Sequence, residues 1–592
     1  MRRRAFLMPA AGAALAQTVG PFMGRQVVFG RKGMVAAEHP LEGLAALRVL
    51  ERGGNAIDAA AAAFYMTGVV EPSEAGLGGD GFLLAYLAKP GRVVLINGTG
   101  PAPKLATRER FAANGSIPPD GPDASTVPGA VGGFDLALKR YGTRKYPELL
   151  RDAIDAAENG HAVTAWGASN FRTAFDKFAR YESTARTYFP EGRPWRTGEW
   201  VTQPDHARTL RAIASAGADA FYRGSIARTI DASQRKTGGL IRLDDLREFQ
   251  AAEDEPLRIR YKDLDLYQCA PNSGGITMLI ALNILEGIDL RSMGHDSPRY
   301  VHTIVEAFKL AFADRHRWVA DPRFFREIPV AGLLSKEYAA ARRALIRPDR
   351  AIRGAAPPGD PRAGKAILEG RSIEYASPTA ARSGGSPEAN RGDQTSSFAI
   401  ADSFGNVVSV THSVNGGFGC GVVVDGAGFV LNNRMPYFAL DPADPNVLAP
   451  GKRVRQGTLP ALALRNGKPY LAWNTPGGDT IPQTMAQAFL NVVEFAMNVQ
   501  QACEAPTAIT SNFPVSMFPQ APGDGLAIPR AMAEGLAGPL AAMGHPVKVT
   551  EAQEPYRMTA AGAGAMKMIR IAETGVFEGG VSPAKDDWVA GW

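Results

Sequence analysis

Cysteine is scarce in this sequence: its 592 residues include only 3, Cys269, Cys420 and Cys503. So few and so widely separated cysteines exclude a disulfide-stapled scaffold and a zinc ribbon. Long hydrophobic runs are also missing, since no apolar stretch of about 18 residues follows the N-terminal segment. This excludes a polytopic membrane protein, and we expect no membrane span in the mature chain. With 45% hydrophobic residues, the sequence is that of a globular protein with a large core.

A strong excess of charge of one sign is absent as well. Lys and Arg number 65 against 59 Asp and Glu, a net charge of +6. No dense stripe of Lys and Arg with interleaved aromatic residues occurs, so we expect no nucleic-acid partner. The 8 histidines show no H-E-x-x-H or other tight spacing, so we predict no metal site. A G-x-S-x-G nucleophile elbow is missing too.

Two glycine-rich segments resemble nucleotide-binding motifs in their residue pattern. Residues 76–81 satisfy G-x-G-x-x-G, and residues 359–366 nearly satisfy the P-loop pattern. A dinucleotide motif needs a strand before it and a helix after it, whereas the strand-like run 82–86 follows here. The second segment lacks the Ser or Thr that would hold magnesium. We therefore predict neither an NAD-type oxidoreductase nor an NTPase, and we expect no cofactor.

The N-terminal residues 1–30 resemble a targeting segment. Three arginines, 2–4, precede the mildly apolar stretch 8–19, and Ala14-Leu15-Ala16 supplies a cleavage site of the small-x-small type. Paired arginines followed by Phe-Leu are typical of a twin-arginine signal. We predict a periplasmic or secreted protein. The alternative is a basic N-terminus without export function, which would leave the protein in the cytoplasm.

Hydrophobic periodicity indicates a chain of both helices and strands, without internal repeats. It predicts helices at 41–51, 55–66, 300–319 and 480–496, and strands at 82–87, 93–96, 429–431, 461–465 and 470–474. Residues 353–394 are rich in Gly, Pro, Ala, Ser and Arg and show no periodicity, which indicates a solvated loop. A hairpin pattern begins abruptly after this loop, with strands 395–402 and 407–414 about the turn 403–406.

The hairpin begins with Thr395, directly after the loop. An internal threonine is a poor nucleophile, because no base lies beside its hydroxyl. Cleavage of the Gln394–Thr395 bond would give Thr395 an α-amine, with a reference pKa of about 7.7–8.0, that can take the hydroxyl proton. The pattern alone leaves an ordinary strand start as the alternative.

Motifs along most of the chain resemble the γ-glutamyltranspeptidase family. They span roughly residues 33–580 in the expected order and comprise 34–36, 53–60, 70–72, 76–82, 127–129, 273–275, 306–315, 394–398, 431–433 and 475–478. The resemblance implies an α+β fold, the four-layer αββα sandwich of N-terminal-nucleophile hydrolases. It also implies a precursor that cleaves itself between Gln394 and Thr395. The products would be a large subunit, 31–394, and a small subunit, 395–592, which together form one αββα unit.

The resemblance also assigns site residues. Thr395 would be the nucleophile, and Ser413 stands where the family has a Thr that hydrogen-bonds the nucleophile. Asn415 matches a substrate-contacting Asn. Gly477 and Gly478 match the paired glycines whose N–H groups form the oxyanion hole, where the backbone must approach the substrate closely.

Other positions depart from the family pattern around the γ-glutamyl group. Thr99 stands where an Arg pairs with the substrate carboxylate, and Gln456-Gly457 replaces a Ser-Ser that helps hold it. Arg434 and Tyr437 replace the acidic pair that holds the α-ammonium. These changes favour a different acyl group, one that offers a carboxylate to Arg434, unless Arg434 points to solvent. They resemble the branch with the cephalosporin acylases and oxamate amidohydrolase.

We therefore predict a self-processing hydrolase that cleaves γ-glutamyl-like amide bonds in small molecules or peptides through a threonyl acyl-enzyme. Its family-level name would be γ-glutamyltransferase or glutathione hydrolase, and transfer to an amine acceptor stays open beside hydrolysis. One alternative is an amidohydrolase or acylase acting on an oxamate- or glutaryl-type amide. Another is an inactive homologue that only binds.

Overall fold

The computed structural model describes residues 24–376, 393–550 and 564–592. Most of the predicted targeting segment, residues 1–23, lies outside the described residues, as does 377–392 of the predicted loop. Residues 28–30, at the end of the predicted targeting segment, instead form an edge strand, β1 (Val28–Gly30), paired with β18 (Phe577–Val581). The folded body of the described chain therefore begins before residue 31.

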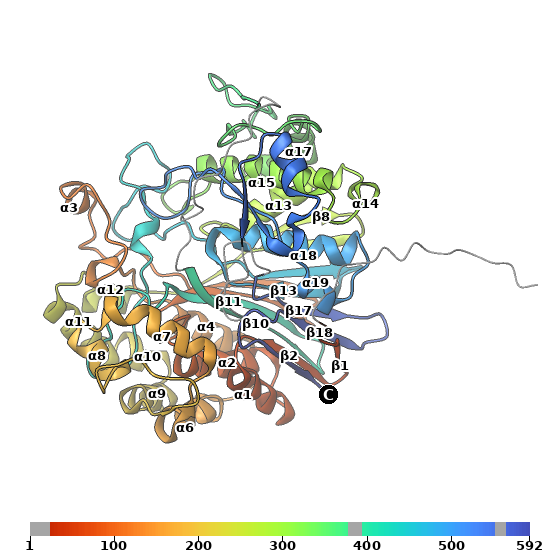
Figure 1. The fold of residues 1–592 in the computed structure, drawn as a ribbon. Helices are drawn as coiled ribbons and strands as arrows, with labels where there is room; N and C mark the ends of the chain where they lie inside the picture. The colour runs from red at the N-terminus through yellow and green to blue at the C-terminus, as the bar shows by residue number, and fades with distance from the viewer. Residues whose placement is uncertain (1–23, 377–392, 551–563) are drawn as a thin grey trace, which may run out of the picture.

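Two seven-stranded antiparallel sheets stack at the centre of the molecule (Figure 1). The first sheet has the order β1, β18, β17 (Lys567–Ile571), β13 (Lys468–Asn474), β12 (Ala461–Arg465), β9 (Leu264–Gln268) and β8 (Leu257–Tyr261). The second has the order β19 (Trp588–Gly591), β2 (Gly33–Ala37), β10 (Asp393–Asp402), β11 (Val407–Gly416), β3 (Asp80–Leu87), β4 (Arg92–Asn97) and β7 (Ala252–Asp254). Small and aliphatic side chains, among them Ala399, Ala401 and Leu462, fill the space between the sheets.

Helices cover the outer face of each sheet. A core on the second sheet includes side chains of α1 (Pro40–Glu51), α2 (Ala56–Val70) and α4 (Ala130–Tyr141). A core on the first sheet includes side chains of α13 (Gly275–Glu286), α15 (Pro298–Trp318) and α18 (Ile481–Val493). Figure 1 shows these two groups on opposite sides of the paired sheets. The predicted four-layer αββα arrangement is confirmed.

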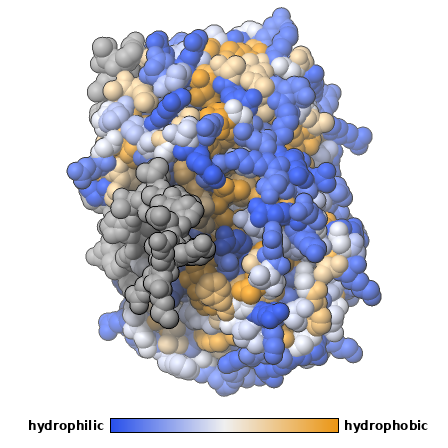
Figure 2. All heavy atoms as spheres, turned by 90° about the vertical axis from the view of Figure 1, so that its right-hand side faces the viewer, coloured by the Kyte–Doolittle hydropathy of each residue, from blue (hydrophilic) through white to orange (hydrophobic). Residues whose placement is uncertain are grey.

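Further helices and strands surround this body. The helices are α3 (Arg108–Ala112), α5 (Tyr146–Leu149), α6 (Arg151–Asn159), α7 (Ala165–Phe178), α8 (Glu182–Tyr188), α9 (Pro204–Ala216), α10 (Ala218–Tyr222), α11 (Ser225–Thr237), α12 (Leu243–Glu248), α14 (Leu290–Met293), α16 (Val330–Leu333), α17 (Lys336–Arg343), α19 (Val499–Glu504), α20 (Arg530–Ala533) and α21 (Ala537–Ala542). The strands are β5 (His161–Ala162), β6 (Trp200–Val201), β14 (Ile509–Thr510), β15 (Leu526–Pro529) and β16 (Val547–Thr550). Most of the face in Figure 2 is hydrophilic, with a hydrophobic band running through it.

Local sequence signals place several elements correctly. Asn55 caps α2 by accepting hydrogen bonds from the N–H groups of Ile57 and Asp58, and all of α2 is buried, as its alanine-rich sequence predicts. The predicted strand 429–431 is wrong. Its residues make only single bridges, Gly78 with Leu431 and Val423 with Val430. They are apolar because they are buried, not because they belong to a sheet.

Residues 353–376 form no helix or strand, as predicted, but they are not the freely solvated loop that we expected. Trp318 Nε1 donates to the carbonyl of Gly359 at 3.1 Å, and Arg342 Nη1 donates to that of Ala366 at 2.7 Å. These bonds from α15 and α17 fix the segment to the helical layer. The segment lacks hydrophobic periodicity, and hydrogen bonds from buried side-chain donors to its backbone carbonyls hold it in place.

Candidate active site

Thr395 lies where the pairing of β10 and β11 changes register. Gln394 pairs with Asn415 and Ser396 pairs with His412, which leaves Ser413 and Val414 opposite Thr395. Such an irregularity bends a strand and redirects side chains, and it often occurs beside active sites. Thr395 is buried here, with 3% of its surface exposed.

Three atoms form a hydrogen-bond chain at this irregularity. Thr395 Oγ1 lies 3.1 Å from Ser413 Oγ and donates to it. Ser413 Oγ in turn donates to the carbonyl oxygen of Gln394 at 2.7 Å and accepts the N–H of Asn415 at 2.7 Å. The expected nucleophile, its hydroxyl partner and the carbonyl of the bond expected to be cut are therefore in direct contact.

A second group of predicted residues lies next to Ser413. Arg434 Nη1 donates to Asn415 Oδ1 at 2.9 Å, and the guanidinium lies 5.5 Å from the ring centre of Tyr437. Arg434 is only 2% exposed, so the alternative that it points to solvent is wrong. Sequence reasoning missed its counter-ion, Asp80, which accepts from Arg434 Nε at 3.1 Å and from Gln456 Nε2 at 2.9 Å.

Asp80 changes the electrostatics that the sequence suggested. Burial raises the pKa of its carboxyl, and the charge and hydrogen bond of Arg434 lower it. Arg434 Nη2 is 3.0 Å from Asp80 Oδ1 as part of this ion pair, but within the described residues it makes no hydrogen bond. Arg434 is thus a compensated cation whose buried Nη2 atom lacks a hydrogen-bond partner among the described residues. The signal for Asp80 was a buried arginine, which needs a counter-ion.

Thr99 is connected to Gln456 through Asn272. Its hydroxyl donates to Asn97 Oδ1 at 2.6 Å and lies 3.3 Å from Asn272 Oδ1. The carbonyl of Asn272 accepts the N–H of Gln456 at 3.2 Å. Within the described residues no hydrogen bond joins Thr99 to Arg434, so Thr99 is part of the support behind Gln456.

Gly477 and Gly478 form the turn that leads into η4 (Gly478–Thr480), which contacts β10 and precedes α18. Their φ angles are 129° and 56°, a region that disfavours residues with a Cβ atom. Gly457 packs against this turn so closely that an added Cβ would lie 2.8 Å from the carbonyl oxygen of Gly478. The glycines of both segments thus let backbone approach backbone beside the nucleophile's strand.

Charged side chains fill the layer beneath Thr395, and sequence reasoning missed them. Glu74 Oε2 accepts the N–H of Thr395 at 3.0 Å and the ammonium of Lys585 at 3.1 Å. Lys585 also binds Glu38, which pairs with Lys567 at 2.7 Å. All four charged side chains are at least 95% buried. These ion pairs bring the N-terminal and C-terminal parts of the chain together, so no local pattern could reveal them.

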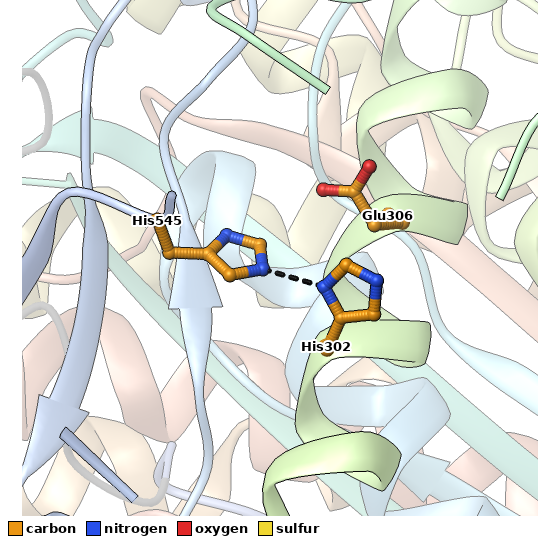
Figure 3. Close-up of side chains that lie close together, drawn as sticks. All are labelled: His302, Glu306 and His545. Carbon is orange, nitrogen blue, oxygen red and sulfur yellow. Dashed lines mark hydrogen bonds between the residues drawn. The ribbon is translucent and has the colours of Figure 1, made fainter. Parts of the chain in front are cut away.

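Figure 3 shows another buried cluster, His302 and Glu306 on α15 and His545 in the loop before β16. His302 Nδ1 and His545 Nε2 share a hydrogen bond of 2.8 Å, and His302 Nε2 donates to the carbonyl of Arg347 at 2.6 Å. The Glu306 carboxylate already pairs with Lys309 at 2.8 Å. A metal ion would meet this buried ammonium, so the residues do not fit a cation and instead fasten α15 to the C-terminal segment.

A cavity of about 730 Å³ opens at the other end of the β10–β11 hairpin. Its lining includes Tyr86, Val407, Arg465, Tyr470 and Arg570 and none of the predicted site residues. Among the described residues, no helix combines the length and the apolar character needed to cross a bilayer.

The sequence profile named Gamma-glutamyltranspeptidase matches residues 44–592. The chain belongs to the gamma-glutamyltranspeptidase family. It is 35% identical over 530 residues to the Acylase ACY 1 proenzyme of Pseudomonas sp. (strain SE83), covering 88% of each chain. It is 32% identical over 493 residues to the Glutathione hydrolase proenzyme of Escherichia coli (strain K12), covering 80% of each.

Among solved structures, cephalosporin acylase from Bacillus halodurans superimposes with a TM-score of 0.84 at 32% identity, covering 99% of each chain. A gamma-glutamyltranspeptidase of Helicobacter pylori superimposes with a TM-score of 0.52 at 33% identity, covering 56% of this chain and 95% of that one. The chain is therefore a hydrolase of the gamma-glutamyltranspeptidase family, related to both glutathione hydrolases and acylases. Relatives of both kinds are named proenzymes.

Proposed function

We propose that the protein is a self-processing amidohydrolase that uses Thr395 first to cut its own chain and then to cleave amide substrates. The observation that carries the proposal is the hydrogen-bond chain from Thr395 Oγ1 through Ser413 Oγ to the Gln394 carbonyl. It joins a nucleophile, a hydroxyl relay and the carbonyl that the nucleophile must attack. The gamma-glutamyltranspeptidase match and the proenzyme names of the relatives support it.

In self-cleavage, Thr395 Oγ1 attacks the carbonyl carbon of Gln394. Ser413 Oγ donates to the oxygen that becomes negative, as it already does in the uncut chain. The C–N bond then breaks, and the threonine nitrogen, which contacts Glu74, receives the hydroxyl proton. The resulting ester is hydrolysed by water. The products are a carboxylate at Gln394 and a free hydroxyl and α-amine at Thr395.

In turnover, the new α-amine takes the proton from Thr395 Oγ1 as this oxygen attacks the substrate carbonyl. The N–H groups of Gly477 and Gly478 would stabilise the oxyanion. The proton passes to the leaving amine as the amide C–N bond breaks, and an acyl ester on Thr395 remains. Water, or an amine acceptor, then releases the acyl group.

Arg434, Asn415 and Gln456 supply the side of the site that would bind the acyl group. Arg434 Nη2 has no hydrogen bond among the described residues, which favours an acyl group with a terminal carboxylate. The neighbouring acid, Asp80, has both oxygens engaged by Arg434 and Gln456, which disfavours an α-ammonium. We therefore favour a glutaryl- or oxamate-type amide over a γ-glutamyl amide. The structural similarity to cephalosporin acylase supports this choice.

Intact mass and N-terminal sequencing of the purified protein test the proposal. We expect two polypeptides, the smaller beginning Thr-Ser-Ser-Phe. Thr395→Ala should remain one chain and show no turnover, because both reactions use the same hydroxyl. A cleaved Thr395→Ala protein, or an uncut wild-type chain that turns over amides, would refute the assignment.

Variants of Ser413 give a finer test of the relay. Ser413→Ala removes the donor to the Gln394 carbonyl, and loss of an oxyanion donor slows a reaction by about 100- to 1,000-fold. We therefore expect self-cleavage to slow by about that factor. The matched control Ser413→Thr retains the hydroxyl and should process at close to the wild-type rate.

A further inference from the structure

Glu74 is held in one position by four donors. Its Oε2 accepts from Thr395 N and Lys585 Nζ, and its Oε1 accepts from Trp166 Nε1 and Asn170 Nδ2, both at 3.0 Å. A protonated carboxyl would need an acceptor for its own proton, and none of the four partners offers one. Burial raises the pKa of Glu74 and Lys585 opposes this. The four donors favour the carboxylate form.

Lys585 is also held in place by several contacts. Its ammonium contacts Glu74, Glu38 and the carbonyl of Thr395, the last at 3.3 Å, and it lies 5.2 Å from the ring centre of Trp166. It therefore binds the nucleophile's residue both directly, at the carbonyl, and through Glu74, at the nitrogen. Burial lowers the pKa of the ammonium, but its negative partners outweigh this and raise the pKa above its ordinary value, which favours the charged form.

Other titratable groups face the same layer from every neighbouring element. Burial raises the pKa of Glu71, beyond α2, well above its usual value, and Glu71 Oε1 has no partner among the described residues. Burial also raises the pKa of Glu42 and Asp587 to about 7 and lowers that of His412 to about 3. Lys567 contacts Glu38 and Asp587 but not Glu74. Lys585 is thus the cation that directly offsets the carboxylate at Thr395.

We propose that Glu74 and Lys585 act as a buried pair that positions the α-amine of Thr395 and keeps it neutral for its role as the base. The inference rests on the proposed self-cleavage and threonyl nucleophile. Glu74 accepts one amine N–H and so orients the nitrogen lone pair. A lone carboxylate there would favour the protonated amine, which is no base, and Lys585 cancels that effect.

The charges predict shifts of opposite sign. Lys585→Met leaves Glu74 uncompensated, so the pKa of the amine rises and the acidic limb of the pH–rate profile moves to higher pH. Nearby charges shift a pKa by about 1–3 units, and we expect a shift within this range. Glu74→Gln removes the negative charge, so the limb should move to lower pH.

The readout is the pH dependence of sulfonylation by an aryl sulfonyl fluoride, followed by intact mass of the small fragment. In this reaction a bond forms between Thr395 Oγ1 and sulfur, fluoride leaves, and the α-amine takes the hydroxyl proton. No amide substrate is needed. Labelling by the wild type without turnover of any amide would count against the proposed function alone, and the shifts would still test the Glu74–Lys585 pair.

Lys585→Arg keeps the positive charge, so the acidic limb of its labelling profile should lie at the wild-type pH. Lys567→Met is the matched control for the loss of a buried lysine. Lys567→Met should destabilise comparably, as a fall in Tm, but shift the limb less than Lys585→Met. If Lys585→Met is not processed, the double variant Glu74→Gln/Lys585→Met is labelled in its place; it restores charge balance, so its acidic limb should lie near that of the wild type. Shifts of the same sign in Glu74→Gln and Lys585→Met, or equal shifts in Lys567→Met and Lys585→Met, would overturn the proposal.

Discussion

The proposed choice of acyl group depends on the positive charge of Arg434. This charge is paired with the carboxylate of Asp80, whose Oδ1 lies 3.0 Å from Arg434 Nη2. A free arginine would strongly repel an α-ammonium and attract a carboxylate. The buried Arg434–Asp80 pair repels an α-ammonium and attracts a carboxylate more weakly, because the negative charge of Asp80 cancels much of the electrostatic field of Arg434. What remains is directional, namely the N–H groups of Arg434 Nη2 and the neighbouring amides of Asn415 and Gln456. Specificity at this site is therefore a matter of hydrogen-bond matching more than of net charge.

This predicts a substrate preference. The ratio of kcat/KM for glutaryl-p-nitroanilide to that for γ-glutamyl-p-nitroanilide should exceed 1 in the wild type. Arg434→Gln should lower kcat/KM for the glutaryl substrate by about 10- to 100-fold, since a hydrogen bond to a charged group contributes roughly 1.5–3 kcal/mol. Asp80→Asn/Arg434→Gln is the matched control, because it leaves no unpaired buried carboxylate. A wild-type preference for γ-glutamyl would place Arg434 outside the acyl site.

Among the elements, the glycine-rich segment 76–81 has a packing role in place of nucleotide binding. The N–H of Asn432 donates to the carbonyl of Gly78 at 2.9 Å, and Gly78 bridges to Leu431. An added Cβ on Gly78 would lie 1.9 Å from the carbonyl oxygen of Val430. Backbone contact between these two segments is what places Arg434 beside Asp80.

Gly78→Ala should therefore disrupt the site at a distance. The Cβ must displace residues 430–434, so we expect little or no self-cleavage and a Tm several degrees lower. Gly467→Ala, in the turn between β12 and β13, is the control. Its φ is 75° and an added Cβ meets nothing within 4 Å, so we expect a cost of about 1 kcal/mol and normal processing. Equal processing of the two variants would contradict this role for Gly78.

Elements with a local signal could be predicted from the sequence, and contacts between distant elements could not. The cap at Asn55 and the turn at 403–406 lie within a few residues of the structures that they specify. Asp80 and Arg434 are 354 positions apart, and Glu74 and Lys585 are 511 apart. The apolar run 429–431 was misread as a strand because burial by packing and burial in a sheet produce the same composition.

At the scale of the whole molecule, the proposed cut divides both sheets between the two products. In the second sheet β10, which would belong almost entirely to the small subunit, lies between β2 of the large subunit and β11. β11 then pairs with β3 of the large subunit. In the first sheet β12 and β9 pair across the same division, and so do β1 and β18. Neither product retains a complete sheet.

The two subunits should therefore stay together after cleavage and come apart only on unfolding. Separation would expose unpaired strand edges and both faces of the core between the sheets, at a cost close to that of unfolding. We expect one peak in size-exclusion chromatography, which gives two bands on a denaturing gel. In a urea titration, loss of that peak should coincide with the change in tryptophan fluorescence, because Trp473 on β13 is buried in the core beneath α18. Release of a folded subunit at a lower urea concentration would show that one half of the sandwich is stable alone, contrary to the interleaved order of its strands.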